Sequence, residues 1–106
     1  MTGKASRDKG RRWELSLAHW FGTSTTANTR PGLHDDGGDI VPPADLHAVI
    51  EAKDHARWTV AAWFDELVPK CTHGETPLLI LKRRNRPTGD ALVVMRLSDY
   101  WPTEGK

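Results

Sequence analysis

The fold of the chain is easiest to predict from DLHAVIEAKDH, residues 45–55 of 106. Its branched and small apolar residues predict a β-strand over residues 46–54. Successive residues of a strand point to opposite faces of the sheet, so Ile50 falls on one face while Glu51 and Lys53 share the other. An unpaired charge is costly to bury. Glu51 and Lys53 must therefore contact each other, a metal ion or solvent.

The other elements follow from hydrophobic periodicity and turn residues. Apolar residues at helical spacing predict helices, whereas β-branched or apolar runs bounded by glycine, proline and polar residues predict strands. We expect helices over residues 6–22 and 57–71, and strands over residues 23–30, 39–41, 46–54, 77–83 and 91–97. The order α-β-β-β-α-β-β predicts an α/β fold, with a mixed five-stranded sheet flanked by helices. The second and third strands are expected to form a hairpin.

The length predicts a single domain over residues 1–106, with flexible ends at residues 1–5 and 102–106. Cys71 is the only cysteine, so the chain can form no internal disulfide and no cysteine-based zinc site. No apolar stretch approaches the length needed to cross a membrane. These features predict a cytoplasmic protein without a membrane partner.

The net charge of +1 conceals two basic clusters and one acidic cluster. The basic clusters lie near the N-terminus and in the turn between the last two strands: Lys4, Arg7, Lys9, Arg11 and Arg12, then Lys82, Arg83, Arg84 and Arg86. The acidic cluster comprises Asp35, Asp36 and Asp39. This distribution suits a protein that binds phosphates and holds a metal ion between them. The alternative is that the clusters are solvated surface.

Two further carboxylates are candidates for the same site as Glu51. Glu14 projects from the edge of the apolar stripe of the first helix, towards the body of the protein. Asp39 follows Gly37 and Gly38, which permit a ligand to approach the backbone closely. Whether these carboxylates meet Glu51 depends on the fold around them.

The register of the expected hairpin decides where Asp39 lies. The tightest turn would set Asp39 opposite Ala48, whereas a wider loop or a bulge would bring it beside Glu51, and the sequence leaves both open. If the two carboxylates meet, they repel each other unless a cation lies between them. Mg²⁺ accepts such oxygen ligands, and the backbone carbonyl of Ile50 could supply another. Lys53 could then orient the attacking water or offset charge on a phosphate.

Together these residues resemble the active-site pattern of the PD-(D/E)xK nuclease superfamily. More closely, the chain is similar to archaeal-type Holliday junction resolvases and their small phage and bacterial relatives. The matching residues are a basic run and helix glutamate, a glycine turn and aspartate, and an E-x-K pair: Arg7, Lys9, Gly10 and Glu14, then Gly37, Gly38 and Asp39, then Glu51 and Lys53. The resemblance covers roughly residues 6–95. It departs from the family in having Gly38 for the motif's proline and no serine in the loop at residues 31–38.

The resemblance implies a restriction-endonuclease-like core and a homodimeric, Mg²⁺-dependent endonuclease that cuts branched DNA, such as a four-way junction, in recombination and repair. Mn²⁺ could substitute for Mg²⁺. Asp39 and Glu51 would ligate the metal, Glu14 would bind it through water, and Lys53 would act in catalysis. The expected DNA-binding residues are Arg7, Lys9, Arg11, Arg12, Arg30, His34, Lys82, Arg83, Arg84 and Arg86. We expect the two basic clusters to contact different arms of the DNA, or the second cluster to contact the dimer partner.

Other functions remain open. One is a different nuclease of the same core, of the repair, restriction or virus-type replication-repair kind. Another is a DNA-binding module without catalysis. A third is a plain α/β domain whose charges are surface ion pairs, which predicts that Asp39 and Glu51 lie far apart. His34 is either a phosphate contact, a base or an ordinary polar loop residue.

Overall fold

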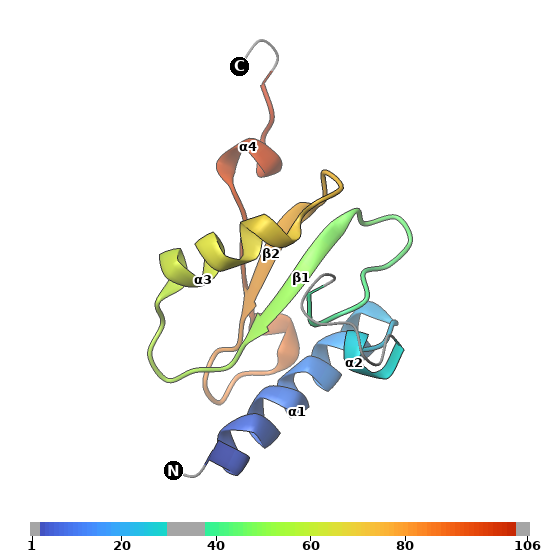
Figure 1. Cartoon of the computed structure of the whole chain (residues 1–106). Coiled ribbons are helices and arrows are strands. Elements are labelled where there is room, and N and C mark those ends of the chain that lie inside the picture. The colour runs from blue at the N-terminus through green and yellow to red at the C-terminus, as the bar shows by residue number, and fades with distance from the viewer. Residues whose placement is uncertain (1–2, 30–37, 104–106) are drawn as a thin grey trace.

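The computed structural model describes residues 3–29 and 38–103. Its elements, in chain order, are α1 (Gly3–Phe21), α2 (Thr26–Thr29), β1 (Ala48–Lys53), α3 (Val60–Leu67), the 3₁₀ turn η1 (Val68–Lys70), β2 (Thr76–Leu81), the 3₁₀ turn η2 (Thr88–Asp90), β3 (Leu92–Val94) and α4 (Leu97–Tyr100). Figure 1 shows the long helix α1 on one side of the sheet and α3 on the other. The architecture is therefore α/β with helices on both faces, as the sequence predicts.

The sheet is mixed, with strand order β1-β2-β3. Strands β1 and β2 are parallel, with Ile50 opposite Leu78, and α3 forms the crossover between them. Strands β2 and β3 are antiparallel. Strand β1 therefore lies at an edge of the sheet, with one side free to receive other segments.

Two apolar clusters hold the helices on the sheet. Trp13 and Leu17 of α1 pack with Ile50 and its neighbours on one face. On the other face, Val49 packs with Leu67 from α3. This division follows the alternation of β1, which sends successive side chains to opposite helices. Glu51 belongs to the α3 face, where an otherwise apolar environment makes its charge costly.

The sheet is smaller than the sequence predicts, with three strands instead of five. The segment 23–30, expected as a strand, contains α2, and Thr25 forms only an isolated bridge with Ile40. The hydroxyl of Thr26 donates a hydrogen bond to the carbonyl of Gly38 at 2.7 Å. Tertiary bonds of this kind outweigh the weak strand preference of a threonine-rich segment.

The expected hairpin over residues 39–54 does not form as two paired strands. Gly38 and Ile40 make isolated bridges to Ile50, and no ladder continues from them in the described chain. The Pro-Pro pair that follows has no amide hydrogens to extend a ladder. The segment around Asp39 is therefore docked on the edge of β1 instead of belonging to the sheet.

The C-terminal elements are also shorter than expected. The strand expected over residues 91–97 is limited to Leu92–Val94. Leu92 and Val93 are exposed, so of the last two strands β2 is covered on both faces and β3 is not. After it, α4 projects away from the sheet (Figure 1). The helix expected over residues 57–71 begins at Val60 and tightens into a 3₁₀ turn at η1, where proline removes an amide donor.

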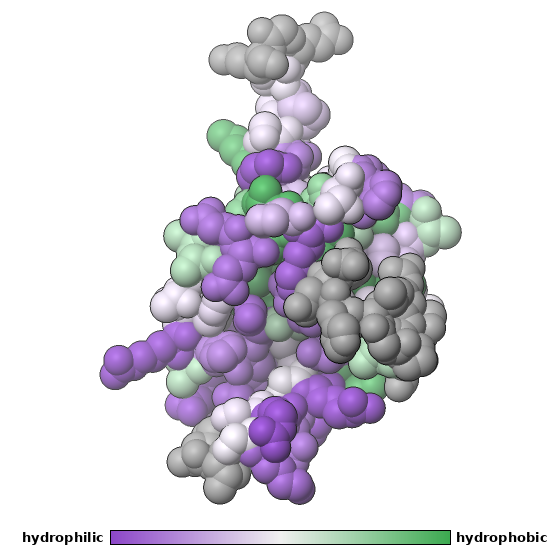
Figure 2. All heavy atoms as spheres, in the orientation of Figure 1, coloured by the Kyte–Doolittle hydropathy of each residue, from purple (hydrophilic) through white to green (hydrophobic). Residues whose placement is uncertain are grey.

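The surface is largely hydrophilic where α1 is exposed (Figure 2). Among the described residues, no helix is long and apolar enough to cross a membrane.

Candidate active site

Gly38 fixes Asp39 against the free edge of β1. The backbone of Gly38 has φ +74°, and a Cβ there would lie 2.5 Å from the carbonyl oxygen of Ile50 and 2.8 Å from Cγ1 of Val49. Proline, which holds φ near −65°, could not adopt this conformation. Glycine therefore replaces the proline of the family motif here because the backbone of β1 comes too close for any side chain.

Two hydrogen bonds complete this docking. The amide of Asp39 donates to the carbonyl of Ile50 at 2.8 Å. The amide of Ala52 donates to Oδ2 of Asp39 at 2.9 Å. Asp39 thus spans the edge from Ile50 to Ala52, and its carboxylate lies at the level of Glu51. This placement is the wider register that the sequence left open, not the tight turn opposite Ala48.

The carboxylates of Asp39 and Glu51 interact strongly. Burial, followed by the negative charge of Glu51 and a hydrogen bond with it, raises the pKa of Asp39 to about 8. Glu51 itself is only 8% exposed. Two buried carboxylates at close range favour either a shared proton or a bound cation. The plain reading, with the two acids far apart, does not describe this edge.

Glu14 approaches the same pair from α1. Burial raises the pKa of Glu14, the charge of Glu51 raises it further, and Arg11 opposes these effects. Glu14 is therefore close enough to the carboxylate pair for their charges to interact. No set of three metal-binding side chains is nevertheless gathered in ligating geometry within residues 3–29 and 38–103.

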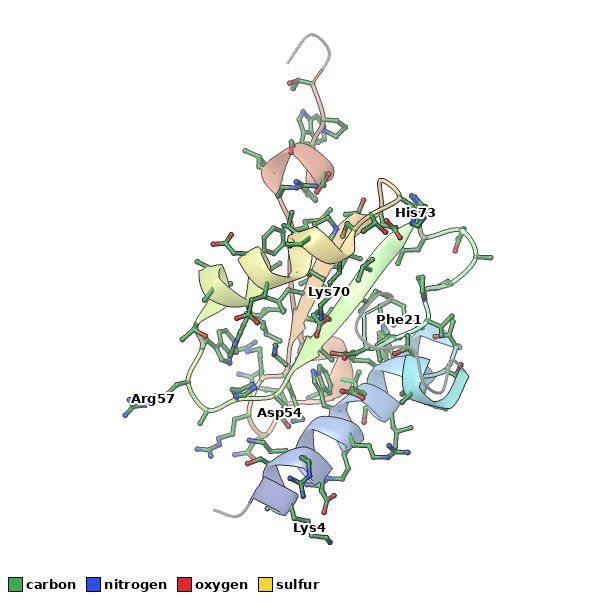
Figure 3. All side chains as sticks on the ribbon, viewed as in Figure 1. Lys4, Phe21, Asp54, Arg57, Lys70 and His73 are labelled. Carbon is green, nitrogen blue, oxygen red and sulfur yellow. The ribbon has the colours of Figure 1, made fainter. Side chains whose placement is uncertain are left out.

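Lys70 is the residue that sequence reasoning missed. Its ammonium donates to Oε1 of Glu51 at 2.9 Å, in a pair whose side chains are 26% and 10% exposed. Figure 3 shows Lys70 between α3 and β1. The residue follows α3 in η1, so the parallel crossover returns it over the strand. The sequence did show a lysine at the end of the helix that follows the Glu51 strand. The pairing could not be predicted because the two residues are 19 positions apart in the sequence.

Lys53 contacts an aromatic ring instead of Glu51, the partner that the sequence suggested. Its ammonium lies 5.6 Å from the ring centroid of Trp63, a cation–π distance, and the His55 ring lies 5.0 Å from the same ring, tilted by 41°. Glu51 is thus paired with a lysine, as one of the expected alternatives had it, but the lysine is Lys70 and not Lys53. Lys53 lies at the end of β1 on an aromatic support.

The oxygen donors at this edge fit a hard divalent cation. Asp39 and Glu51 offer carboxylate oxygens, and their mutual repulsion is what a cation would relieve. The carbonyl of Ile50, the further ligand suggested by the sequence, already accepts the amide of Asp39, so only its second lone pair remains for a metal. Glu14 adds a third negative charge that interacts with Glu51.

The two basic clusters, expected to contact different DNA arms, come together in space. Lys9 and Arg12 of α1 line one cavity with Lys82 and Arg84 from the turn after β2. The other described members of the expected DNA-binding set lie around α1 and the same turn: Arg7, Arg11, Arg83 and Arg86. Arg30 and His34, together with Asp35 and Asp36, lie outside the described residues.

Comparison with known proteins identifies the family. Residues 5–104 match the model of the family described as “Phage putative PDDEXK endonuclease”. No curated protein and no solved structure matches the chain. The match supports the superfamily that the motifs predict and does not extend to the resolvases. Since it spans nearly the whole sequence and includes the edge of β1 described above, the chain belongs to this phage PDDEXK endonuclease family.

Proposed function

We propose that the protein is a metal-dependent DNA endonuclease that hydrolyses phosphodiester bonds in branched DNA, as a Holliday junction resolvase does. The observation that carries the proposal is the docking of Asp39 on β1 beside the buried Glu51, through a glycine that no other residue can replace without strain. Metal-assisted phosphate hydrolysis needs converging carboxylates with a nearby cation; here Asp39 is docked beside Glu51, and Lys53 follows Glu51 on β1. Membership of a phage endonuclease family supports the same reaction class.

In this proposal Asp39 and Glu51 would hold Mg²⁺, or Mn²⁺ in its place, and Glu14 would bind the cation through water. The cation, when bound, activates a water and offsets charge on the cleaved phosphate. Lys53 orients that water or neutralises the phosphate, held in place by its contact with Trp63. Lys70 balances the charge of Glu51 before the cation binds. In the proposal, the Glu51 carboxylate therefore has two arrangements: paired with Lys70 when the cation is absent, and bound to the cation when it is present.

The branched substrate and a homodimer are the finer parts of the proposal. Two cuts placed symmetrically across a junction require two active sites, and a homodimer supplies them. Large side chains on β3, on α4 and directly after α4 offer a surface for the second copy: Leu92, Val93, Leu97, Tyr100 and Trp101 are all exposed. Sedimentation analysis of the purified protein tests the dimer independently of cleavage.

The test is cleavage of an end-labelled four-way junction beside linear duplex, single-strand and flap substrates, with Mg²⁺ and with EDTA. Asp39→Asn and Lys53→Ala are run with the wild type. Paired symmetric nicks confined to the junction, lost in EDTA and in both variants, support a resolvase. Equal cutting of all substrates retains the endonuclease and rejects branch specificity.

A second function, DNA binding without catalysis, makes the opposite prediction. It expects tight binding of DNA and no cutting with either metal. The same experiment separates it, because binding can be measured in EDTA and cleavage after Mg²⁺ or Mn²⁺ is added. The presence of acidic residues at all three carboxylate positions favours the enzyme.

A further inference from the structure

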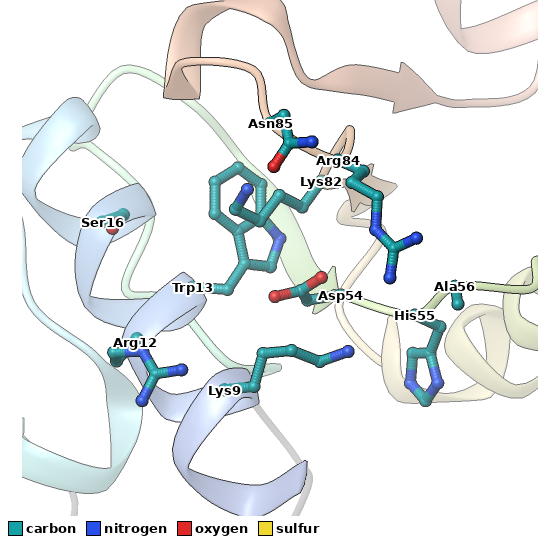
Figure 4. Close-up of a pocket in the computed structure, with 10 residues that line it drawn as sticks. All are labelled: Lys9, Arg12, Trp13, Ser16, Asp54, His55, Ala56, Lys82, Arg84 and Asn85. Carbon is teal, nitrogen blue, oxygen red and sulfur yellow. The ribbon is translucent and has the colours of Figure 1, made fainter. Parts of the chain in front are cut away.

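A cavity of about 440 Å³ lies beside the carboxylate edge, and three separate segments line it (Figure 4). Helix α1 contributes Lys9, Arg12, Trp13 and Ser16, the end of β1 contributes Asp54, His55 and Ala56, and the turn after β2 contributes Lys82, Arg84 and Asn85. The volume lies within the range of cavities that hold small ligands or parts of larger ones. The cavity therefore has room for part of a ligand, and the charges of its lining residues decide which chemistry would fit it.

The lining is strongly cationic. Four basic side chains surround the cavity, against the single carboxylate of Asp54. Lys9, Arg12 and Arg84 form no ion pair with any carboxylate in the described part of the chain. Some basic residues elsewhere are instead paired along the chain, such as Lys4 with Asp8 at 3.6 Å and Arg86 with Asp90 at 3.4 Å. The cations at the cavity are thus available to an anion.

The aromatic floor of the cavity does not favour a base. Trp13 is 2% exposed, so its ring has no open face on which a nucleobase could stack. The ammonium of Lys82 already lies 5.9 Å from the centroid of that ring. What remains accessible is a set of hydrogen-bond donors and positive charges. A phosphate group fits this chemistry better than a base or an apolar ligand.

The cavity adjoins the proposed catalytic residues through the chain itself. Trp13 immediately precedes Glu14 on α1. Asp54 follows Glu51 by three residues, a span of roughly 10 Å along an extended strand. An anion in the cavity would therefore lie near the phosphate that the carboxylates attack, on a neighbouring part of the same DNA.

We propose that this cavity binds one phosphate group of the DNA substrate, close to the bond that is cut, and that both basic clusters hold that same phosphate. The proposal rests on the proposed nuclease function for the identity of the ligand. It replaces the expectation that the two clusters contact different arms of the DNA. The phosphate is either a diester within a strand or a monoester at a strand end.

The experiment measures DNA binding in EDTA, by fluorescence anisotropy, for Lys9→Ala, Arg84→Ala and the double variant. Lys4→Ala is the matched control, since it removes the same charge from α1 but Lys4 does not line the cavity and pairs with Asp8 instead. We expect each cavity variant to weaken binding about fivefold to tenfold, and the control less than twofold. Because both side chains hold one phosphate, the double variant should lose clearly less than the product of the two single effects.

Three DNA probes distinguish the two kinds of phosphate. A linear duplex with 5′-phosphate ends, the same duplex with 5′-hydroxyl ends and a closed circle are compared. If the variants lose binding only to the duplex with 5′-phosphate ends, the cavity binds a phosphate monoester. If they lose binding equally to all three DNA probes, it binds a phosphate diester. Either result supports the proposal if the two single effects are not multiplicative.

Multiplicative effects, or variants that bind like the wild type, would overturn the cavity proposal even if Mg²⁺-dependent cleavage persists. Failure of the proposed nuclease function would be seen separately. If the wild type cuts no DNA but the cavity variants still lose binding non-additively, the nuclease function is rejected and the phosphate site remains. Thermal melts of all variants establish that they fold.

Discussion

The carboxylate edge of β1 and the basic cavity beside it place charge in opposite ways. At the edge, Asp39 and Glu51 are buried together and burial raises the pKa of Asp39. At the cavity, cations such as Lys9 and Arg84 line an open space and have no acidic partner among the described residues. The first region holds repulsive energy that a cation releases, whereas the second holds unpaired charge that an anion neutralises. The two charge arrangements are those that the proposed metal site and the proposed phosphate site would each require.

The largest effect is expected from Asp39→Asn. The asparagine carbonyl can still accept the amide of Ala52, so the segment should stay docked on β1. The negative charge needed by the cation is lost, and cleavage should fall roughly 100-fold to 1,000-fold. Steady-state cleavage with Mg²⁺ measures this. DNA binding in EDTA should stay within twofold of the wild type, and a matched loss of binding would contradict the assignment of Asp39 to the metal.

Gly38→Ala should produce the largest loss of stability. The new Cβ would lie 2.5 Å from a backbone oxygen of β1, and the backbone φ is positive. We expect a loss of about 2–4 kcal/mol in the free energy of unfolding, measured with urea. Gly74→Ala is the matched control, because Gly74 has φ +75° but open space around it. Equal losses in the two variants would show that φ, and not the contact with β1, fixes Gly38.

These two positions show which parts of the site are encoded locally in the sequence. The helix glutamate, the glycine-aspartate turn and the E-x-K strand were recognisable because local spacing encodes them. The strand predicted over residues 23–30 was wrong, because bonds from Thr26 to a segment 12 residues away override its β-branched composition. Lys70 was missed for the same physical reason, since a tertiary crossover brings it to Glu51. Local periodicity predicted elements, whereas long-range contacts decided which residues meet.

The stability of the metal-free protein should depend on pH through Asp39. Because the folded state raises the pKa of Asp39 to about 8, it binds the proton more tightly than the unfolded chain does. Its contribution is therefore most favourable below pH of about 4 and is lost as the pH rises towards 8. Asp39→Asn removes this loss, so the variant should gain stability relative to the wild type between pH 5 and pH 9. Urea unfolding in EDTA at several pH values measures the difference, and a constant difference would contradict it.

The smallest effect, and the one that most directly tests the two arrangements of Glu51, is expected from Lys70→Met. The methionine keeps an apolar stem but removes the charge that pairs with Glu51 at 2.9 Å. Because the pair is only partly buried, we expect the metal-free protein to lose about 1–2 kcal/mol. Mg²⁺ should then raise the melting temperature of the variant more than that of the wild type, since the cation no longer competes with a lysine. Lys53→Ala is the control, because Lys53 contacts Trp63. If Mg²⁺ raises the melting temperature of Lys70→Met less than that of the wild type, Lys70 helps to bind the cation and does not compete with it for Glu51.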